Sequence, residues 1–250
     1  YPDQALVWVN KALALAEQLD HSLSLAFALA IGAAGLHLLR REPEAAGPYT
    51  AQLSALVAKR KLTAMQPWAD ILMGVEQARK GNLEAGITQV RQGITAWAAT
   101  GAVSGRSFQL LLLVNLYQQA DNIDAALETV DEALALVEET GERTSEAEHR
   151  RLKGVLYAAQ GMDRAKVETH LQAALKIARQ QSARAWALRT GTSLAKVLKD
   201  QDRNEEARKL LTPLHDAFTE GFDTPDFQEA QALLRTLMPT ACKERESPQS

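Results

Sequence analysis

The chain has 250 residues, of which 46% are apolar, 24% are charged and 5% are aromatic, and its formal net charge is −3. Strong helix formers such as Ala, Leu and Glu are abundant and Gly and Pro are few, which favours an all-α fold over a sheet-rich one. The near-neutral balance argues against nucleic acid as the main partner, and the single cysteine, Cys242, excludes an intrachain disulfide or a cysteine-based metal cluster.

One sequence pattern recurs about every 40 residues: a turn, a short acidic start, a small residue, an apolar residue and a second small residue. The first small position falls at Ala5, Ala46, Gly86, Ala126, Val167 and Ala207. A separate landmark in the preceding helix falls at Ala34, Gly74, Val114, Gly154 and Ala195. Two landmarks with the same period indicate an array of antiparallel helix pairs, in which small side chains allow the two helices of a pair to approach closely.

The pattern predicts helices, in chain order, over residues 2–19, 22–40, 43–60, 64–80, 82–99, 104–120, 122–140, 145–160, 163–181, 183–200 and 204–219. A final helix is expected to begin at Thr224 and Pro225, to end near Leu237 and to cap the last pair. We therefore expect a single array over residues 1–238 and a polar, disordered tail over residues 239–250.

Two further expectations concern the beginning of the array. Tyr1 stands at the start of a second helix that has no first helix before it, so we expect the array to be truncated inside a repeat. The most apolar stretch, from Leu25 to Leu39, is interrupted by His37 and is shorter than the roughly 20 residues of a membrane span. We interpret it as a buried helix and expect no membrane contact and a cytoplasmic location.

The helix-pair pattern resembles the tetratricopeptide repeat. The matching positions, in the family's order of large, large, small, aromatic, small, large and small, are Leu110, Leu113, Val114, Tyr117, Ala126, Val130 and Ala133. The resemblance implies a tetratricopeptide-like α-solenoid. The repeat of about 40 residues is longer than the roughly 34 residues typical of that family.

Nearly the whole chain also resembles the C-terminal repeat region of large bacterial signalling proteins. The similar segments include Ala133-Leu-Ala-Leu-Val-Glu-Glu-Thr-Gly-Glu-Arg, Glu146-Ala-Glu-His-Arg-Arg-Leu-Lys-Gly and Phe218-Thr-Glu-Gly-Phe-Asp-Thr-Pro-Asp-Phe-Gln-Glu-Ala. In those proteins a class III nucleotide cyclase domain and an AAA-type or STAND-type ATPase module precede the array. Similar arrays follow ATPase modules in LuxR-type transcription regulators. The resemblance implies a regulatory region, whose partner would be a protein or peptide, including the ATPase module of the same chain.

The register of the tetratricopeptide family places the first helices on a concave surface. The resulting candidate groove residues are Trp68, Phe108, Asn115, Gln118, Arg151, Arg189, Lys196 and Lys199. The groove would change from apolar to basic along the array, which suits an acidic or amphipathic peptide or a small anionic ligand. The alternative is that the apolar residues pack between pairs and the basic residues form a solvated face.

An enzymatic reading has little support from the sequence. The five histidines form no pair at metal-ligand spacing, and phosphate-loop and dinucleotide-loop motifs are absent from the printed sequence. His149 follows Glu146 and Glu148 on one helix, but a structural role is the simpler interpretation. We therefore expect a scaffold that is not an enzyme and uses no cofactor or metal. A self-associating oligomerisation module and an effector-sensing region remain the alternatives.

Overall fold

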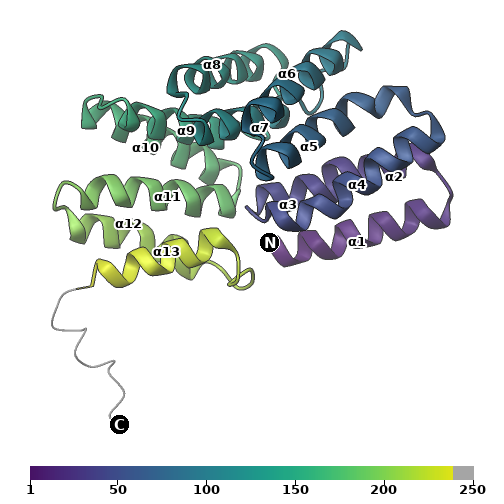
Figure 1. Ribbon diagram of the computed structural model, residues 1–250. Coiled ribbons are helices and arrows are strands. Elements are labelled where there is room, and N and C mark those ends of the chain that lie inside the picture. The colour runs from purple at the N-terminus through teal and green to yellow at the C-terminus, as the bar shows by residue number, and fades with distance from the viewer. Residues whose placement is uncertain (239–250) are drawn as a thin grey trace.

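The computed structural model describes residues 1–238, and every regular element within them is a helix (Figure 1). The first helices of the successive pairs are the continuous α2–η1–α3 helix (Ser22–Phe27, the π-helical Ala28–Ala34 and Gly35–Leu39), α5 (Gln66–Arg79, after the 3₁₀ turn η2 at Thr63–Met65), α7 (Arg106–Gln119), α9 (Glu146–Ala159) and α11 (Arg184–Lys199). The second helices are α1 (Pro2–Gln18), α4 (Pro43–Arg60), α6 (Leu83–Ala99), α8 (Ile123–Thr140), α10 (Arg164–Gln180) and α12 (Asn204–Asp216). These bounds confirm the predicted all-α array and its period of about 40 residues.

Short turns join the two helices of each pair. In the α5–α6 turn, Gly81 has a φ of +97°, and the next amide, that of Asn82, donates to the Gln77 carbonyl at 3.0 Å. This left-handed residue ends the first helix because it turns the chain back toward the last open carbonyls, and glycine adopts it without a steric penalty. The same turn forms at Asp121 and at Gly161, where the sequence predicts helix ends.

The small landmark residues lie where paired helices come closest. A Cβ atom on Gly86 would stand 2.5 Å from the carbonyl oxygen of Gly74 and 2.8 Å from the Cβ of Ala78. Beside these contacts, one column of apolar residues is completely buried, consisting of Val90, Val130, Leu171 and Leu211. Small residues thus set the spacing within a pair, and larger apolar residues fill the space beside them.

Helix α13 (Pro225–Thr236) packs against α11 and α12 and caps the array. Its Phe227 is 5% exposed and stacks on His215 with ring centroids 4.4 Å apart. This confirms the predicted capping helix. The expected disordered tail lies outside the described residues.

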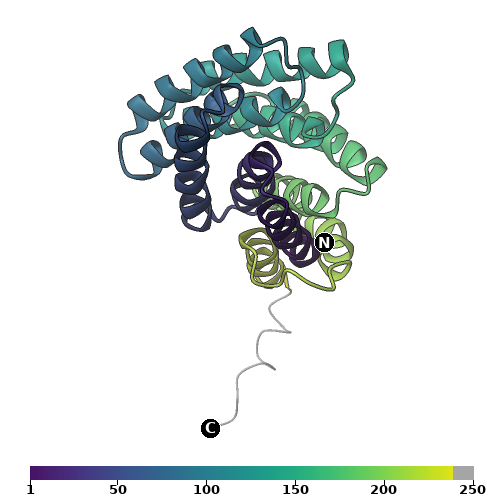
Figure 2. The same ribbon diagram turned by 90° about the vertical axis from the view of Figure 1, so that its right-hand side faces the viewer.

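The array curves until its two ends meet, so that α1 lies beside the C-terminal repeat in both views (Figures 1 and 2). The Asp3 carboxylate accepts a hydrogen bond from the Gly221 amide at 2.9 Å, and the Asp3 amide donates to the Glu220 carboxylate at 3.1 Å. The guanidinium of Arg184 stands over the ring of Tyr1 at 4.9 Å. These contacts join residues more than 180 positions apart and close the concave side into a ring.

Ser22–Leu39 is a helical stretch within residues 1–238 that is long and apolar enough to cross a membrane by length and composition. The core helix of a water-soluble repeat passes the same test. One side of the stretch, including Leu29, Ala30 and Ala34, is buried in the array, whereas Phe27 and Ile31 on another side are exposed.

A concave cavity as the candidate binding site

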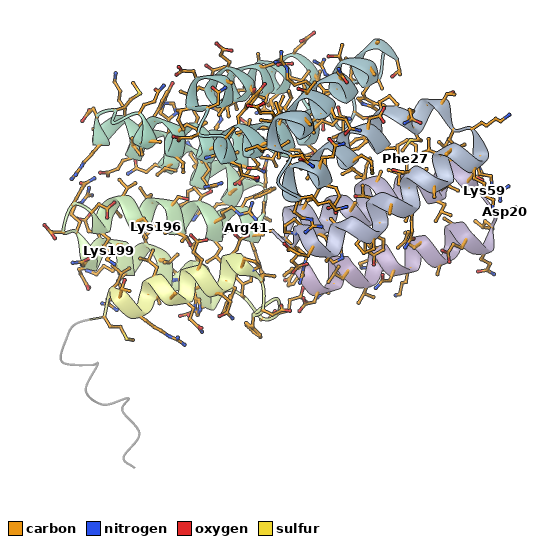
Figure 3. The ribbon with its side chains drawn as sticks, in the orientation of Figure 1. Asp20, Phe27, Arg41, Lys59, Lys196 and Lys199 are labelled. Atoms are coloured by element: carbon orange, nitrogen blue, oxygen red, sulfur yellow. The ribbon has the colours of Figure 1, made fainter. Side chains whose placement is uncertain are left out.

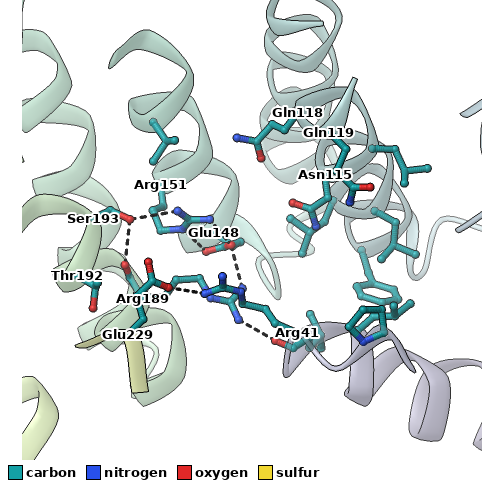
Figure 4. A pocket seen from close by; sticks show the side chains of 18 of the residues that line it. Arg41, Asn115, Gln118, Gln119, Glu148, Arg151, Arg189, Thr192, Ser193 and Glu229 are labelled. Carbon is teal, nitrogen blue, oxygen red and sulfur yellow. Dashed lines mark hydrogen bonds and ion pairs between the residues drawn. The ribbon is translucent and has the colours of Figure 1, made fainter. Parts of the chain in front are cut away.

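The closed array surrounds a cavity of about 870 Å³ on its concave side (Figure 4). Its wall is formed mainly by the first helices of successive pairs, with contributions from the α3–α4 turn, α10 and α13. Leu38, Val75, Phe108 and Leu111 supply its apolar part. The cavity lies where the family register places the concave groove.

A buried ion cluster forms one side of the cavity. The Glu148 carboxylate is 2% exposed and accepts hydrogen bonds from Arg151 at 2.7 Å and from Arg189 at 3.1 Å. Burial by itself would raise the pKa of Glu148, but the two guanidiniums outweigh it and hold the pKa at about 2. Glu148 therefore remains charged and fixes both arginines in position.

Arg189 also connects the two ends of the array. Its Nε donates to the Asp226 carboxylate at 2.9 Å, and its Nη2 donates to the Leu39 carbonyl at 2.8 Å. Arg41, which follows α3, donates to Asp226 at 3.1 Å and to Glu229 at 2.6 Å. Figure 3 shows Arg41 next to the C-terminal repeat, although it belongs to the first complete pair. The same contacts that close the ring therefore form one rim of the cavity.

Polar amides line the opposite side. Asn115 and Gln118 of α7 border the cavity, and Figure 4 shows them across from Arg151 and Glu148. Within residues 1–238 neither side-chain amide has a hydrogen-bond partner, and the same holds for Gln119. These amides lie beside the apolar Leu111 and are free to bond a ligand in the cavity.

The structure brings six of the eight sequence-predicted residues to the cavity, namely Phe108, Asn115, Gln118, Arg151, Arg189 and Lys196. Trp68 lies in the core instead, fully buried, with its ring 6.2 Å from that of Phe108 and 5.9 Å from that of Trp97. Lys199 lies outside the lining and donates to Thr236 of α13 at 3.0 Å.

Sequence reasoning missed Arg41, Asp226 and Glu229. Arg41 and Asp226 are 185 positions apart, and nothing in the repeat pattern links the turn inside the first complete pair to the capping helix. Their proximity depends on the rotation between successive repeats, which accumulates over the whole array.

His149 does not form an acid–base pair with its acidic neighbours. It is fully buried, and its Nε2 lies 3.0 Å from the Ser107 carbonyl of α7. Burial lowers the pKa of His149, and the Ser107 carbonyl and the charge of Glu148 offset this in part. Glu146 is paired with Arg143 and Arg150. The histidine is thus a core residue between two first helices. Within residues 1–238, no group of three or more His, Cys, Asp and Glu side chains could hold a metal ion.

Comparison with known proteins gives one sequence relative and several structural ones. No protein-family model matches the chain. An uncharacterised protein of Rhizobium meliloti (strain 1021) is 25% identical over 186 residues, which cover 74% of this chain and 18% of that protein. The chain thus spans about a fifth of the length of this curated relative.

The structural likenesses define the fold. The crystal structure of BtubC (BKLC) from P. vanneervenii has a TM-score of 0.55 at 15% identity, with 100% of this chain and 94% of that chain covered. The TPR-like repeats of a kinesin light chain from Podosopora anserina have a TM-score of 0.52 at 16% identity, with 73% and 90% covered. The chain is therefore a tetratricopeptide-like α-solenoid.

Proposed function

We propose that the chain is a non-catalytic scaffold that binds a segment of another protein domain in its concave cavity. The observation that carries this proposal is the pair of unpartnered amides, Asn115 and Gln118, beside apolar side chains in a cavity of about 870 Å³. An extended segment can satisfy such amides with its backbone while it places apolar side chains against Leu111 and Val75. The tetratricopeptide-like fold supports the same class of function.

The charges of the cavity favour an acidic or amphipathic segment. Five cationic side chains line it, whereas two anionic ones do, Glu148 and Glu229. Arg41 and Lys196 are about half exposed, and both are held by the same carboxylate, that of Glu229. A carboxylate on the bound segment can take the place of Glu229 at either cation at little cost, because exposed ion pairs are worth only about 0–1 kcal/mol.

The proposal extends to the larger protein. We propose that the array is the cytoplasmic regulatory region of a bacterial signalling protein with an upstream cyclase or ATPase module, and that this module supplies the bound segment. The sequence resemblance to such regions supports this context. So does the Rhizobium meliloti relative, of which the chain spans only 18%.

Photo-crosslinking tests the binding surface. A benzophenone amino acid placed at Asn115 is compared in the native host with the same group at Gln92, an exposed residue of α6 outside the cavity lining. We expect a defined crosslinked segment from position 115 and none from position 92. Crosslinks of equal yield from both positions would contradict the proposal.

Affinity measurements with the crosslinked segment then test the amides. We expect Asn115→Ala combined with Gln118→Ala to weaken binding of the synthetic segment about tenfold or more. The reason is that backbone groups of the segment, buried in the cavity, would lose their hydrogen bonds to the two amides. Gln92→Ala should leave the affinity unchanged. A small anion that competes with the segment at the same site would identify a ligand-sensing role instead, and an unchanged affinity for the double variant would refute the amide contact.

A further inference from the structure

A large apolar surface is exposed at the beginning of the array. Trp8, Leu15 and Leu19 of the α1 region are exposed to 66, 56 and 66%, and Phe27 and Ile31 of the next helix are exposed to 39 and 45%. Figure 3 shows Phe27 on the side of the molecule away from the C-terminal repeat. Large apolar side chains exposed together on neighbouring helices point to a contact with another structural element.

The repeats themselves show which face of α1 lacks a neighbour. In each later pair, the second helix turns one column of residues toward its own first helix, as Gly86 faces Gly74 and Leu171 faces Gly154. In α1 the equivalent positions are Ala5, Val9 and Ala12, of which the first two are partly exposed and Ala12 is exposed. The residues equivalent to Val9 are Thr50, Val90, Val130, Leu171 and Leu211, all at most 3% exposed, and those equivalent to Ala12 include the buried Leu53, Gly93, Ala133 and Ala174.

The following helix shows the same difference. Ile31 is 45% exposed, whereas its equivalents Ile71 and Leu111 are 0 and 2% exposed. Phe27 is 39% exposed, whereas its equivalents Pro67, Ser107, Ala147 and Leu188 are buried. Each of α5, α7 and α9 packs against the first helix of the pair before it and against the first helix of the pair after it. Within residues 1–238, the α2–η1–α3 helix has such a neighbour only in the following pair, namely α5. The two exposed columns belong to adjacent helices, since α1 packs against α2 and η1.

We propose that Ala5, Val9 and Ala12 of α1, together with Phe27 and Ile31, form the seat of an amphipathic helix supplied by the same polypeptide. This helix would act as the first helix of the pair that α1 completes. Its source follows from the turn geometry. The residues equivalent to Tyr1 in the other pairs, Glu42, Asn82, Asn122, Asp163 and Arg203, are all N-caps of second helices that follow a first helix after a short turn.

A helix in this seat would end beside Tyr1, so a turn of two or three residues suffices to join the two. The curated relative is about five times as long as the matched region, so chain of this kind has ample length outside the repeats described here. A second copy of the protein could fill the seat only by placing the end of one of its own helices beside Tyr1. No feature of the structure requires such an arrangement.

The test compares residues 1–250 with the natural protein extended upstream through about 40 further residues, one repeat length. Trp8 reports on the seat, since the difference between each chain and its Trp8→Phe variant isolates the fluorescence of this side chain. We expect Trp8 to be strongly quenched by acrylamide in the shorter chain and protected in the longer one, which should also unfold at a higher temperature. Equal quenching of Trp8 in both chains, or the absence of coding sequence before Tyr1, would overturn the proposal.

A matched pair of substitutions separates the seat from a general effect of length. Ala12 is exposed, and Ala12→Asp should leave the thermal midpoint of residues 1–250 unchanged but lower that of the longer chain by several degrees. Ala14 is also exposed, as are its equivalents Ala55, Thr95, Ala135 and Lys176, so Ala14→Asp should be neutral in both chains. If Ala12→Asp is neutral in the longer chain, or if both chains dimerise with Trp8 protected, the seat does not hold a helix of the same polypeptide.

Discussion

Glu148 shows how a single buried charge organises the candidate site. Its carboxylate lies between Arg151 and Arg189, and Arg189 in turn contacts Asp226 and the Leu39 carbonyl. Removing one member of a buried pair costs more than the pair contributes, because the remaining charge stays buried without compensation.

We therefore expect Glu148→Gln to lower the free energy of unfolding by about 3 kcal/mol, measured by urea denaturation. Glu138 provides a control, since it is 64% exposed and lies 3.8 Å from both Arg143 and Arg150. Glu138→Gln should change stability by less than about 0.5 kcal/mol. Equal effects of the two substitutions would show that the Glu148 cluster has no structural role.

The acid sensitivity of the array should have two stages. Burial lowers the folded-state pKa of His149 below its ordinary value of 6.5, so the unfolded chain binds the proton more readily. The stability associated with neutral His149 is complete above pH 6.5 and is lost as the pH falls below it, with a limiting slope of about 1.4 kcal/mol per pH unit. Glu148, whose folded-state pKa is about 2 against an ordinary 4.5, contributes stability that is present above pH 4.5 and is lost below it.

Chemical denaturation between pH 7 and pH 3 measures both stages. His149→Gln should flatten the first stage, which begins below pH 6.5, and leave the second in place. An unchanged slope in the first stage would mean that another group is responsible.

At the scale of helices, the small residues decide how closely the pairs pack. A methyl group on Gly86 would overlap the Gly74 carbonyl, so Gly86→Ala must push α5 and α6 apart. We expect it to lower the free energy of unfolding by about 1–3 kcal/mol, the usual cost of overpacking.

Gly47 is the matched helical control. Apart from its chain neighbours, a methyl group there would come nearest to the Glu76 carboxylate, at 3.4 Å, which is an ordinary contact. The higher helix propensity of alanine is opposed by the ring of Pro48, which follows Gly47 inside α4, so Gly47→Ala should change the free energy of unfolding by less than about 1 kcal/mol. If the two substitutions lower the thermal midpoint equally, close packing at Gly86 does not limit the spacing of this pair.

The helices were predictable because local signals determine them. Each turn has a left-handed residue, and each pair has its small residues at one period, so the predicted ranges agree with the structure to within one or two residues at most ends. The differences have local causes. Helix α5 begins at Gln66, two residues after the predicted start, because Thr63–Met65 forms a 3₁₀ turn. The largest difference is at the end of α12, which stops at Asp216 instead of residue 219, after the internal Pro213 and before the turn that leads to α13.

The candidate site was predictable only in part. Asn115, Gln118 and Arg151 follow from the family register, because each depends on its place within one helix. Trp68 shares that register yet faces the core, since its large ring fills the space between Trp97 and Phe108. Arg41 and Asp226 lie outside any local pattern, because only the curvature of the complete array brings them together.

At the scale of the molecule, exposed ion pairs contribute to the closure of the ring. Arg41 is 46% exposed, so its pairs with Asp226 and Glu229 are individually weak and sensitive to salt. We expect Arg41→Ala to open the ring, seen as a larger radius of gyration in small-angle X-ray scattering, most clearly at low ionic strength, where the pairs that it removes are strongest. Lys209→Ala, which removes only a pair with Glu205 inside α12, should leave the scattering unchanged. Identical curves for both variants would show that Arg41 does not hold the ends together.

Hydrogen exchange of the complex tests most directly whether the concave cavity binds a protein segment. The complex is formed with the segment identified by crosslinking and is compared with the free chain. We expect slower exchange in α7, α9 and α11, whose side chains line the cavity, and unchanged exchange in α6 and α8. Protection confined to α6 and α8, with α7 and α9 unaffected, would contradict it.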